Sequence, residues 1–280
     1  MKNPPLVSVL MTAYNREKFI AAAIESVLAS SFTNFEFIIV DDSSMDDTVT
    51  IAKKYEQVED RIKVYVNEKN LGQFGNRNKA ASYATGLYLK YVDSDDIIYP
   101  YTLAAMVKAL KTFPDAALGF CLTHGLCKNP LPYLLEPEEV YQQHFFEGGL
   151  LFAGPSGLIM KRTVFFEMNC FEEYGMPSDN HLALKIAGKY PVVAMTRDLF
   201  WWRLHPDQAF NDETKPQSIL NNLRYASDLV KNHSPLSSKI NKRILHNLNK
   251  IFYKNLLRMA INKLQPALAL SLFLQRRKSL

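Results

Sequence analysis

The chain has 280 residues, of which 48% are hydrophobic and 22% are charged, and its formal net charge is +5. This composition is typical of a globular protein with one large domain or a domain with an appendage, and it excludes an intrinsically disordered chain. The three cysteines form no C-x-x-C pair and have no histidine cluster nearby, which argues against a disulfide framework or a zinc site and favours a reducing compartment such as the cytoplasm.

The first hundred or so residues alternate between apolar stretches and stretches of helical composition. Asp46 is expected in the first turn of its helix, where the helix dipole favours an acid, and Gly86 is expected to cap a helix C-terminus. Alternating strands and helices with short connections predict an α/β fold, a doubly wound and mostly parallel sheet flanked by helices. Strands are predicted at residues 6–12, 35–40, 62–66 and 89–92, and helices at 21–28, 46–55, 76–85 and 100–113.

The fourth predicted strand runs directly into Asp93, Ser94, Asp95 and Asp96. Carboxylates gathered at a strand end repel one another, and they are costly to desolvate without a cationic partner. Mg²⁺ is usually held by one or two carboxylates together with substrate phosphates, and open α/β sheets bind ligands beyond the carboxyl ends of their strands. A metal–diphosphate site is therefore one interpretation, and a polar turn that caps the next helix is the other. Asp96 is assigned the capping role.

Polar residues follow two other predicted strands. Thr12 and Tyr14 end the first strand, and Asp42 ends the second. Tyr14 could stack on a nucleobase and Asp42 could accept a hydrogen bond from a base or a ribose, although each residue alone also fits a turn or a cap. Because parallel strands end at the same edge of a sheet, the three strand ends together indicate a nucleotide pocket.

Four segments, at residues 7–15, 35–44, 70–78 and 92–96, resemble in order and spacing the N-terminal half of inverting family 2 glycosyltransferases, which have the glycosyltransferase-A fold. The resemblance implies a nucleotide-diphosphate-sugar donor, with a UDP-sugar favoured, and a Mg²⁺ or Mn²⁺ cofactor on Asp93 and Asp95. The residues that it assigns to the nucleotide sugar are Thr12, Tyr14, Asn15, Asp42, Gly72, Arg77, Asn78, Asp93, Ser94 and Asp95.

The second half of the chain is less regular. Residues 121–137 are rich in proline and are expected to form a loop or short irregular strands. The glycine-rich segment at 148–162 is expected to bend and enter a strand. Its Gly154, Pro155 and Ser156 resemble the family segment that lines the acceptor and donor-sugar pocket, although a simple strand bend explains them equally well.

Two later segments carry further candidate residues. A helix is predicted over 177–186, with Ser178 as its N-cap and Asp179 in its first turn. Asp179 resembles the second member of the acidic pair that supplies the family's catalytic base, and favourable interaction with the helix dipole is the structural alternative. The segment 201–208 resembles the family's aromatic–Arg–x–His pattern, in which His205 would complete the metal site or touch the diphosphate and Arg203 would neutralise it.

The implied reaction is transfer of a sugar to an acceptor hydroxyl with inversion, in bacterial surface polysaccharide or glycolipid synthesis, with Asp179 as the base. A catalytically inactive sugar-nucleotide-binding relative is an alternative, and so is a receiver-like regulatory module, because Asp41 and Asp42 form an acidic pair. A missing Gly-x-Gly-x-x-Gly motif disfavours a dehydrogenase, and a missing glycine-rich basic loop after the first strand disfavours a sugar nucleotidyltransferase.

A catalytic domain is expected over 1–215, with a donor half at 1–113 and an acceptor half at 114–215, and a basic helical extension over 216–280. From Lys231 to the end there are eleven Lys and Arg and no Asp or Glu, a charge of +11. Since the whole chain carries +5, the preceding residues carry a net charge of −6. These helices would pack on the catalytic body or contact a membrane peripherally on its inner face, which suits a glycan or lipid-linked acceptor. No nucleic-acid motif, signal peptide or apolar run of about 18 residues accompanies them.

Overall fold

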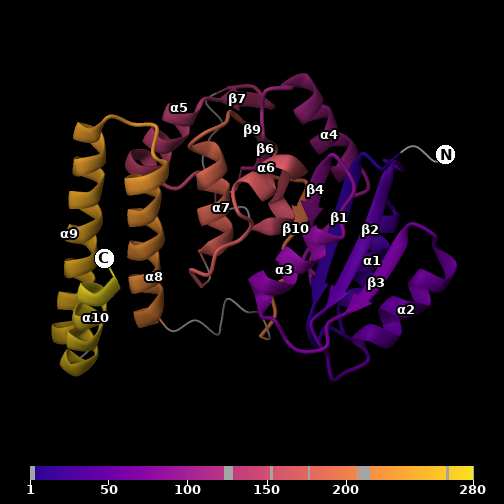
Figure 1. The fold of residues 1–280 in the computed structure, drawn as a ribbon, viewed down its shortest axis with the longest axis horizontal. Helices are drawn as coiled ribbons and strands as arrows, with labels where there is room; N and C mark the ends of the chain where they lie inside the picture. Colours follow the sequence, from indigo (N-terminus) through magenta and orange to yellow (C-terminus); the bar gives the residue numbers. More distant parts are fainter. Residues whose placement is uncertain are drawn as a thin grey trace.

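The structure is a computed structural model that describes residues 4–122, 129–151, 154–175, 177–206, 208, 215–262 and 265–279. Within them, eight strands form one sheet in the order β3-β2-β1-β4-β8-β6-β9-β7, with helices flanking it (Figure 1). This mostly parallel sheet confirms the predicted α/β architecture.

The N-terminal half supplies four parallel strands: β1 (Val7–Ala13), β2 (Phe35–Asp41), β3 (Ile62–Val66) and β4 (Tyr88–Tyr91). In the central pairing, Ala13 lies opposite Asp41 on one side of β1, and Leu10 lies opposite Tyr91 on the other. Since these strands are parallel, their carboxyl ends open on one edge of the sheet. The helices of this half are α1 (Ile20–Leu28), α2 (Thr48–Val58), α3 (Gln73–Ser82) and α4 (Thr102–Thr112).

The second half extends the same sheet with strands of mixed direction. The glycine-rich segment bends into β8 as predicted, and β8 lies between β4 and β6, antiparallel to both. β9 then pairs parallel with β6, and β7 pairs antiparallel with β9. These strands are β6 (Leu118–Cys121), β7 (Tyr133–Leu135), β8 (Leu158–Lys161) and β9 (Val192–Met195). The helical segments are α5 (Pro137–Gln142), the π-helix η1 (Gln143–Glu147), the 3₁₀-helix η2 (Pro155–Gly157), α6 (Arg162–Glu167) and α7 (Ser178–Ala187).

A second, two-stranded sheet joins two distant parts of the chain. β5 (Ile97–Ile98) follows the acidic end of β4, and it pairs antiparallel with β10 (Phe200–Trp201). The pairing places the residues that follow β10, up to Pro206, beside the acidic residues after β4.

The C-terminal residues are helical, as predicted, and lie side by side at the left of Figure 1. α8 (Lys215–Asp228), the π-helix η4 (Leu229–His233), α9 (Ser238–Asn262) and α10 (Pro266–Ser279) follow one another. Leu223 of α8, Phe252 of α9 and Leu272 of α10 share a small core of their own. No helix in the described part of the chain is both long and apolar enough to cross a bilayer.

Two local predictions at helix ends are wrong. α3 ends at Ser82, so Gly86 does not cap it. Glycine is needed there for another reason, since a Cβ atom on Gly86 would lie 2.6 Å from the backbone nitrogen of Ser8. Asp46 precedes α2 instead of lying in its first turn, and one of its oxygens accepts a hydrogen bond from the backbone N–H of Thr48 (3.0 Å).

Candidate active site

The carboxyl edge of the parallel strands opens into a cavity of about 1580 Å³. The loops after β1, β2 and β4 contribute to its wall, and so do the turn before β8, the start of α7 and α8. The predicted site residues on this wall are Thr12, Tyr14, Asn15, Asp42, Gly72, Arg77, Asp93, Ser94, Asp95, Gly154, Pro155, Ser156 and Asp179.

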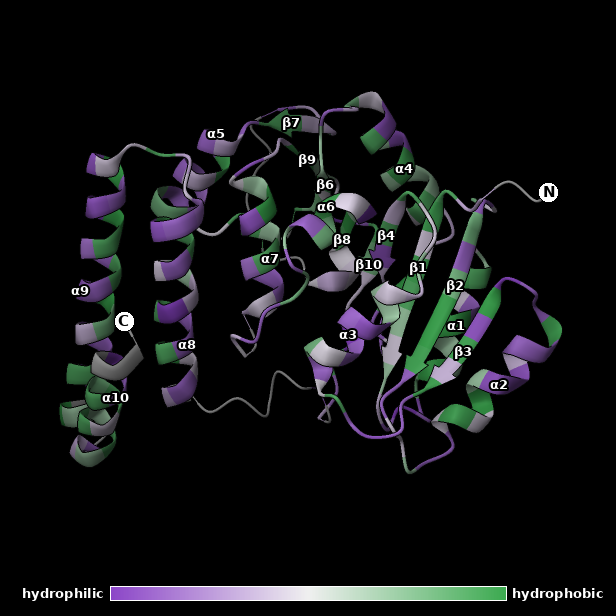
Figure 2. Cartoon of the chain, viewed as in Figure 1, coloured by the Kyte–Doolittle hydropathy of each residue, from purple (hydrophilic) through white to green (hydrophobic). Residues whose placement is uncertain are grey.

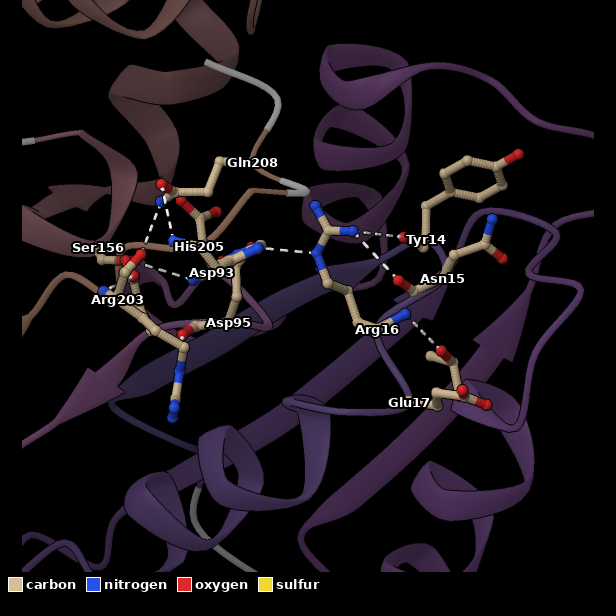
Figure 3. Close-up of polar contacts among 12 residues, drawn as sticks. Tyr14, Asn15, Arg16, Glu17, Asp93, Asp95, Ser156, Arg203, His205 and Gln208 are labelled. Atoms are coloured by element: carbon tan, nitrogen blue, oxygen red, sulfur yellow. Dashed lines mark hydrogen bonds and ion pairs between the residues drawn. The ribbon is translucent and has the colours of Figure 1, made fainter. Parts of the chain in front are cut away.

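The loops after β1 and β2 hold each other in place. Asn15 has a left-handed backbone conformation (φ 53), which asparagine tolerates better than most residues. Its backbone N–H donates to Ser44 Oγ (2.8 Å), and its Oδ1 accepts from the backbone N–H of Met45 (2.9 Å). Tyr14 precedes it and remains 45% exposed, with its ring at the cavity (Figure 3). A flat ligand could therefore stack on Tyr14.

The two adjacent acids after β2 have different surroundings. Asp41 is turned inward, and its carboxylate accepts from the backbone N–H of Ser44 (2.8 Å), while burial raises its pKa. Asp42 lines the cavity, and its Oδ1 accepts from Asn67 Nδ2 and from the backbone N–H of Leu71, both at 2.8 Å. The pair therefore lacks the shared acidic pocket that a receiver-like module requires.

Arg77 of α3 supplies a buried positive charge. It is 3% exposed, and its Nη2 lies 2.7 Å from Asp93 Oδ1. Burial lowers the pKa of Arg77, but the negative charges of Asp93 and Asp179 outweigh that effect and raise it overall. Among the described residues, no acceptor reaches the buried Nε atom of Arg77.

Asp95 is the point where three distant segments meet. Its Oδ2 accepts from Arg16 Nε and lies within hydrogen-bond distance of His205 Nε2, both at 3.0 Å (Figure 3). The Nη1 atom of Arg16 also donates to the backbone oxygens of Tyr14 and Asn15, both at 3.1 Å. Arg16 thus connects the loop after β1 to the acidic end of β4.

Arg203 and Asp96 join the residues after β10 to the acidic end of β4. Arg203 Nε donates to the backbone oxygen of Asp95 (2.9 Å), and its guanidinium lies over the rings of Phe19 and Trp201. Asp96 accepts from the backbone N–H of Arg203 (3.2 Å) and is 2% exposed. Burial and the neighbouring acid Asp93 raise the pKa of Asp96 to about 7.

The capping role assigned to Asp96 is therefore wrong. α4 begins at Thr102, with Tyr101 as its N-cap residue and no side-chain capping bond. Asp96 instead ties the end of β4 to Arg203, a contact between residues far apart in the sequence.

The residues around Asp95 fit a divalent cation. A carboxylate and an imidazole lie side by side, and the carboxylate of Asp93 belongs to the same strand end. Oxygen ligands suit Mg²⁺ and Mn²⁺, and an imidazole ligand is also common for transition metals. Arg16 already brings a positive charge to Asp95, with its Nε 3.0 Å from Asp95 Oδ2.

The segment before β8 supports the site as well as lining it. Ser156 Oγ accepts from the backbone N–H of Asp93 (3.0 Å). The buried Lys90 of β4 donates to the backbone oxygen of Ser156 and to that of Tyr91 (2.9 Å). Ser156 therefore positions Asp93 through this hydrogen bond, in addition to lining the cavity. The residues at 152–153 of the glycine-rich segment lie outside the described part of the chain.

Asp179 enters the cavity from the first turn of α7. Burial raises its pKa, an effect that the charge of Arg77 opposes. Ser178 is the first helical residue and not the predicted N-cap, because Pro177 occupies that position. The Ser178 hydroxyl instead accepts from the backbone N–H of Tyr174 and donates to the backbone oxygen of Gly175, both at 2.8 Å, and so orders the approach to the helix.

Three predicted residues do not line the cavity. Asn78 uses its side-chain amide to hold both backbone groups of Phe171 (2.9 and 3.0 Å), and Arg203 and His205 contact Asp95. Other residues that line the cavity were not predicted from the sequence, among them Arg16, Ser218 and Asn222. Arg16 directly follows the segment 7–15 that resembles the family, so its position could have indicated a role in the site. The sequence of α8 contains no comparable motif.

The comparison with known proteins agrees with this geometry. A model of the family described as Glycosyl transferase family 2 matches residues 8–167, more than half of the chain. The chain belongs to that family. The match covers the parallel strands β1 to β4 and the turn that enters β8.

Relatives and solved structures extend the comparison. A glucosyltransferase of Escherichia coli, named UDP-Glc:alpha-D-GlcNAc-diphosphoundecaprenol beta-1,3-glucosyltransferase WfgD, is 44% identical over 92 residues, which are 33% of this chain and 36% of that relative. The chain spans less than half the length of the curated relatives that it matches first.

Two solved structures share the fold. TarS of S. aureus in complex with UDP-GlcNAc superposes with a TM-score of 0.70 at 20% identity, over 86% of this chain and 71% of that one. The mannosyltransferase PcManGT of Pyrobaculum calidifontis, in complex with GDP-Man and Mn²⁺, gives a TM-score of 0.60 at 18% identity, over 99% and 76% of the two chains.

Proposed function

We propose that this chain transfers a sugar from a nucleotide-diphosphate-sugar donor, with a UDP-sugar favoured, to an acceptor hydroxyl with inversion at the anomeric carbon. The observation that carries the proposal is the shared cavity. Tyr14 and Asp42 offer contacts for a nucleoside, Asp93 and Asp95 offer a charged strand end for a diphosphate, and Asp179 supplies a partly buried carboxylate from a different element.

In this reaction Asp179 accepts the proton of the acceptor hydroxyl while that oxygen attacks the anomeric carbon. The new glycosidic C–O bond forms as the bond between the anomeric carbon and the diphosphate oxygen breaks, and the nucleoside diphosphate leaves with the electron pair. A single displacement of this kind inverts the configuration and needs no covalent enzyme intermediate. The raised pKa of Asp179 supports the assignment, since a more basic carboxylate is a better proton acceptor.

Asp93, Asp95 and His205 are the proposed ligands of a Mg²⁺ or Mn²⁺ ion. When bound, such an ion would neutralise the diphosphate and its developing charge. The Mn²⁺ in the PcManGT complex supports a metal requirement. Arg77 is the fixed positive charge that the chain itself holds next to Asp93.

A lipid-linked sugar is the acceptor class that we propose, in synthesis of a surface polysaccharide or glycolipid. The name of WfgD supports this, because it states a diphosphoundecaprenol-linked GlcNAc substrate. Ser218 and Asn222, one turn apart on α8, line the cavity together with residues from the first 215 positions of the chain. The expected domain boundary at 215/216 would therefore separate the C-terminal helices from a site to which they contribute.

The test is donor binding and transfer in the Asp179→Asn variant. Binding of a panel of nucleotide sugars is measured by calorimetry with and without Mn²⁺, and transfer to a short-chain polyprenyl-diphosphate-linked GlcNAc is measured as release of the nucleoside diphosphate. We expect unchanged donor affinity and a loss of transfer of at least about a hundredfold.

Asp115→Asn, on the exposed surface after α4, is the matched control and should keep full activity. Full turnover by Asp179→Asn would exclude Asp179 as the base. Failure of every nucleotide sugar to bind the wild-type protein would exclude the donor class.

A further inference from the structure

The α9–α10 hairpin exposes an unusual number of large apolar side chains. Among the described residues, seven of the nineteen exposed large hydrophobic side chains belong to these two helices. Leu257 and Ile261 near the end of α9 are 60% and 61% exposed, and Leu270 and Leu274 of α10 are 58% and 48% exposed. We call these four residues the hairpin patch. Several exposed apolar side chains on two helices that pack against each other indicate a contact surface.

Basic residues accompany the hairpin patch on α9. Lys250, Lys254 and Arg258 are exposed, and we call them the basic collar. Positions 250, 254, 257 and 261 are spaced by one, two and three helical turns, so two collar residues and the two α9 residues of the patch share one face of the helix. Basic groups lie earlier along this face and apolar groups lie at its end.

The segment that carries these basic residues contains no acid. The last fifty residues contain no Asp or Glu, while the rest of the chain is net negative. Figure 2 shows green, hydrophobic residues at the lower end of the hairpin, where α9 ends and α10 begins, and purple, hydrophilic ones nearer the start of α9. The faces that the two helices turn toward each other and toward α8 are already filled by Phe252, Leu256 and Leu272, which belong to one buried cluster.

We propose that the hairpin patch inserts into the headgroup region of a bilayer that contains anionic phospholipids, with the basic collar at the level of the phosphates. An apolar surface bordered by lysine and arginine is the combination that binds an anionic membrane interface, because burial of apolar area and charge attraction act together. This docking is independent of the transfer reaction, although it would bring the cavity to a membrane where lipid-linked acceptors reside.

Charge favours a membrane over a second copy of the chain as the occupant. Symmetric pairing through the hairpin patch would bring two basic collars together without an acid nearby, which is unfavourable. An anionic bilayer instead pairs with both features of the surface, and it needs no helix that spans it.

The test is co-sedimentation of the full chain with vesicles of phosphatidylglycerol and phosphatidylcholine, compared with vesicles of phosphatidylcholine alone. We expect binding to the anionic vesicles that weakens with salt. Lys250→Gln, Lys254→Gln and Arg258→Gln together should weaken binding by about a hundredfold, since each charge near an anionic surface contributes about fivefold. Leu257→Ser with Ile261→Ser should weaken it by at least about tenfold.

Lys54→Gln with Val58→Ser, on the exposed face of α2, is the matched control and should bind like the wild type. Circular dichroism and calorimetric donor binding verify that each variant is folded. No binding of the wild type to anionic vesicles would overturn the proposal, and so would equal binding by both hairpin variants. Loss of a wild-type oligomer in the Leu257→Ser/Ile261→Ser variant, with vesicle binding unchanged, would show that a second copy covers the patch.

Discussion

Lys90 allows a quantitative test of the electrostatics beneath the active site. It lies in the centre of the sheet at 0% exposure, and its ammonium group donates to the backbone oxygens of Tyr91 and Ser156. Burial lowers the pKa of Lys90 from 10.5 to about 8, an effect that the neighbouring Cys121 and Asp93 only partly oppose. The folded protein therefore binds this proton less tightly than the unfolded chain does.

The sign and size of the pH effect follow from that difference. Below pH 8, Lys90 is charged in both states, so the native state carries the full cost of burying the charge. Between pH 8 and 10.5 the folded protein has lost a proton that the unfolded chain still binds, and stability rises with pH. At about 1.4 kcal/mol per pKa unit, the change from 10.5 to about 8 corresponds to about 3 kcal/mol, of which about 2.5 kcal/mol is realised between pH 7 and 10.

The assay compares wild type with Lys90→Met by urea unfolding at several pH values from 7 to 10. At pH 7 the variant removes the buried charge but leaves two carbonyl oxygens without their donor, at about 1–3 kcal/mol each, so the two effects nearly offset. By pH 10 the difference in the free energy of unfolding should have moved by about 2.5 kcal/mol in favour of the wild type. Lys108→Met, on the exposed face of α4, should show no such change. A difference between wild type and Lys90→Met that stays constant with pH would refute the reasoning.

Three further outcomes are expected. Gly86→Ala should lower the free energy of unfolding by about 1–3 kcal/mol in urea titrations, because the new Cβ would lie 2.6 Å from the backbone nitrogen of Ser8; wild-type stability would contradict this. Arg16→Gln should raise the Mn²⁺ affinity of the donor-free protein by about tenfold, measured by electron paramagnetic resonance of the free ion, because a positive charge on Asp95 no longer competes; weaker Mn²⁺ binding would argue against a cation site there. Tyr14→Ala should weaken nucleotide-sugar binding by about tenfold in calorimetry through lost stacking while the melting temperature is unchanged, and equal affinity would exclude the stacking role.

Local pattern and tertiary packing disagreed chiefly at the ends of helices. Gly86 looked like a cap because it follows an alanine-rich helical stretch, but its lack of a side chain serves the close approach of β1. Asp96 looked like a cap because it precedes a helix, but it is buried against the backbone of Arg203. Ser178 has the right chemistry for an N-cap, yet its hydroxyl binds the loop before the helix. A capping residue is predicted from its neighbours in the sequence. Each of these three residues is instead held by contacts that the neighbouring sequence does not reveal.

The sequence by itself determined the α/β class and the edge of the sheet at which the candidate site lies. Strand period and polar strand ends are local properties, and parallel pairing then brings Tyr14, Asp42 and Asp93 to one edge whatever the rest of the chain does. Only the tertiary structure decided that Asp95 contacts both Arg16 and His205, the latter 110 positions away, and that α8 completes the cavity. The β5–β10 pairing and the packing of α8 on α7 bring about these contacts. Both depend on which surfaces fit together once the sheet has formed. The periodicity of hydrophobic residues within a segment carries no information about such contacts.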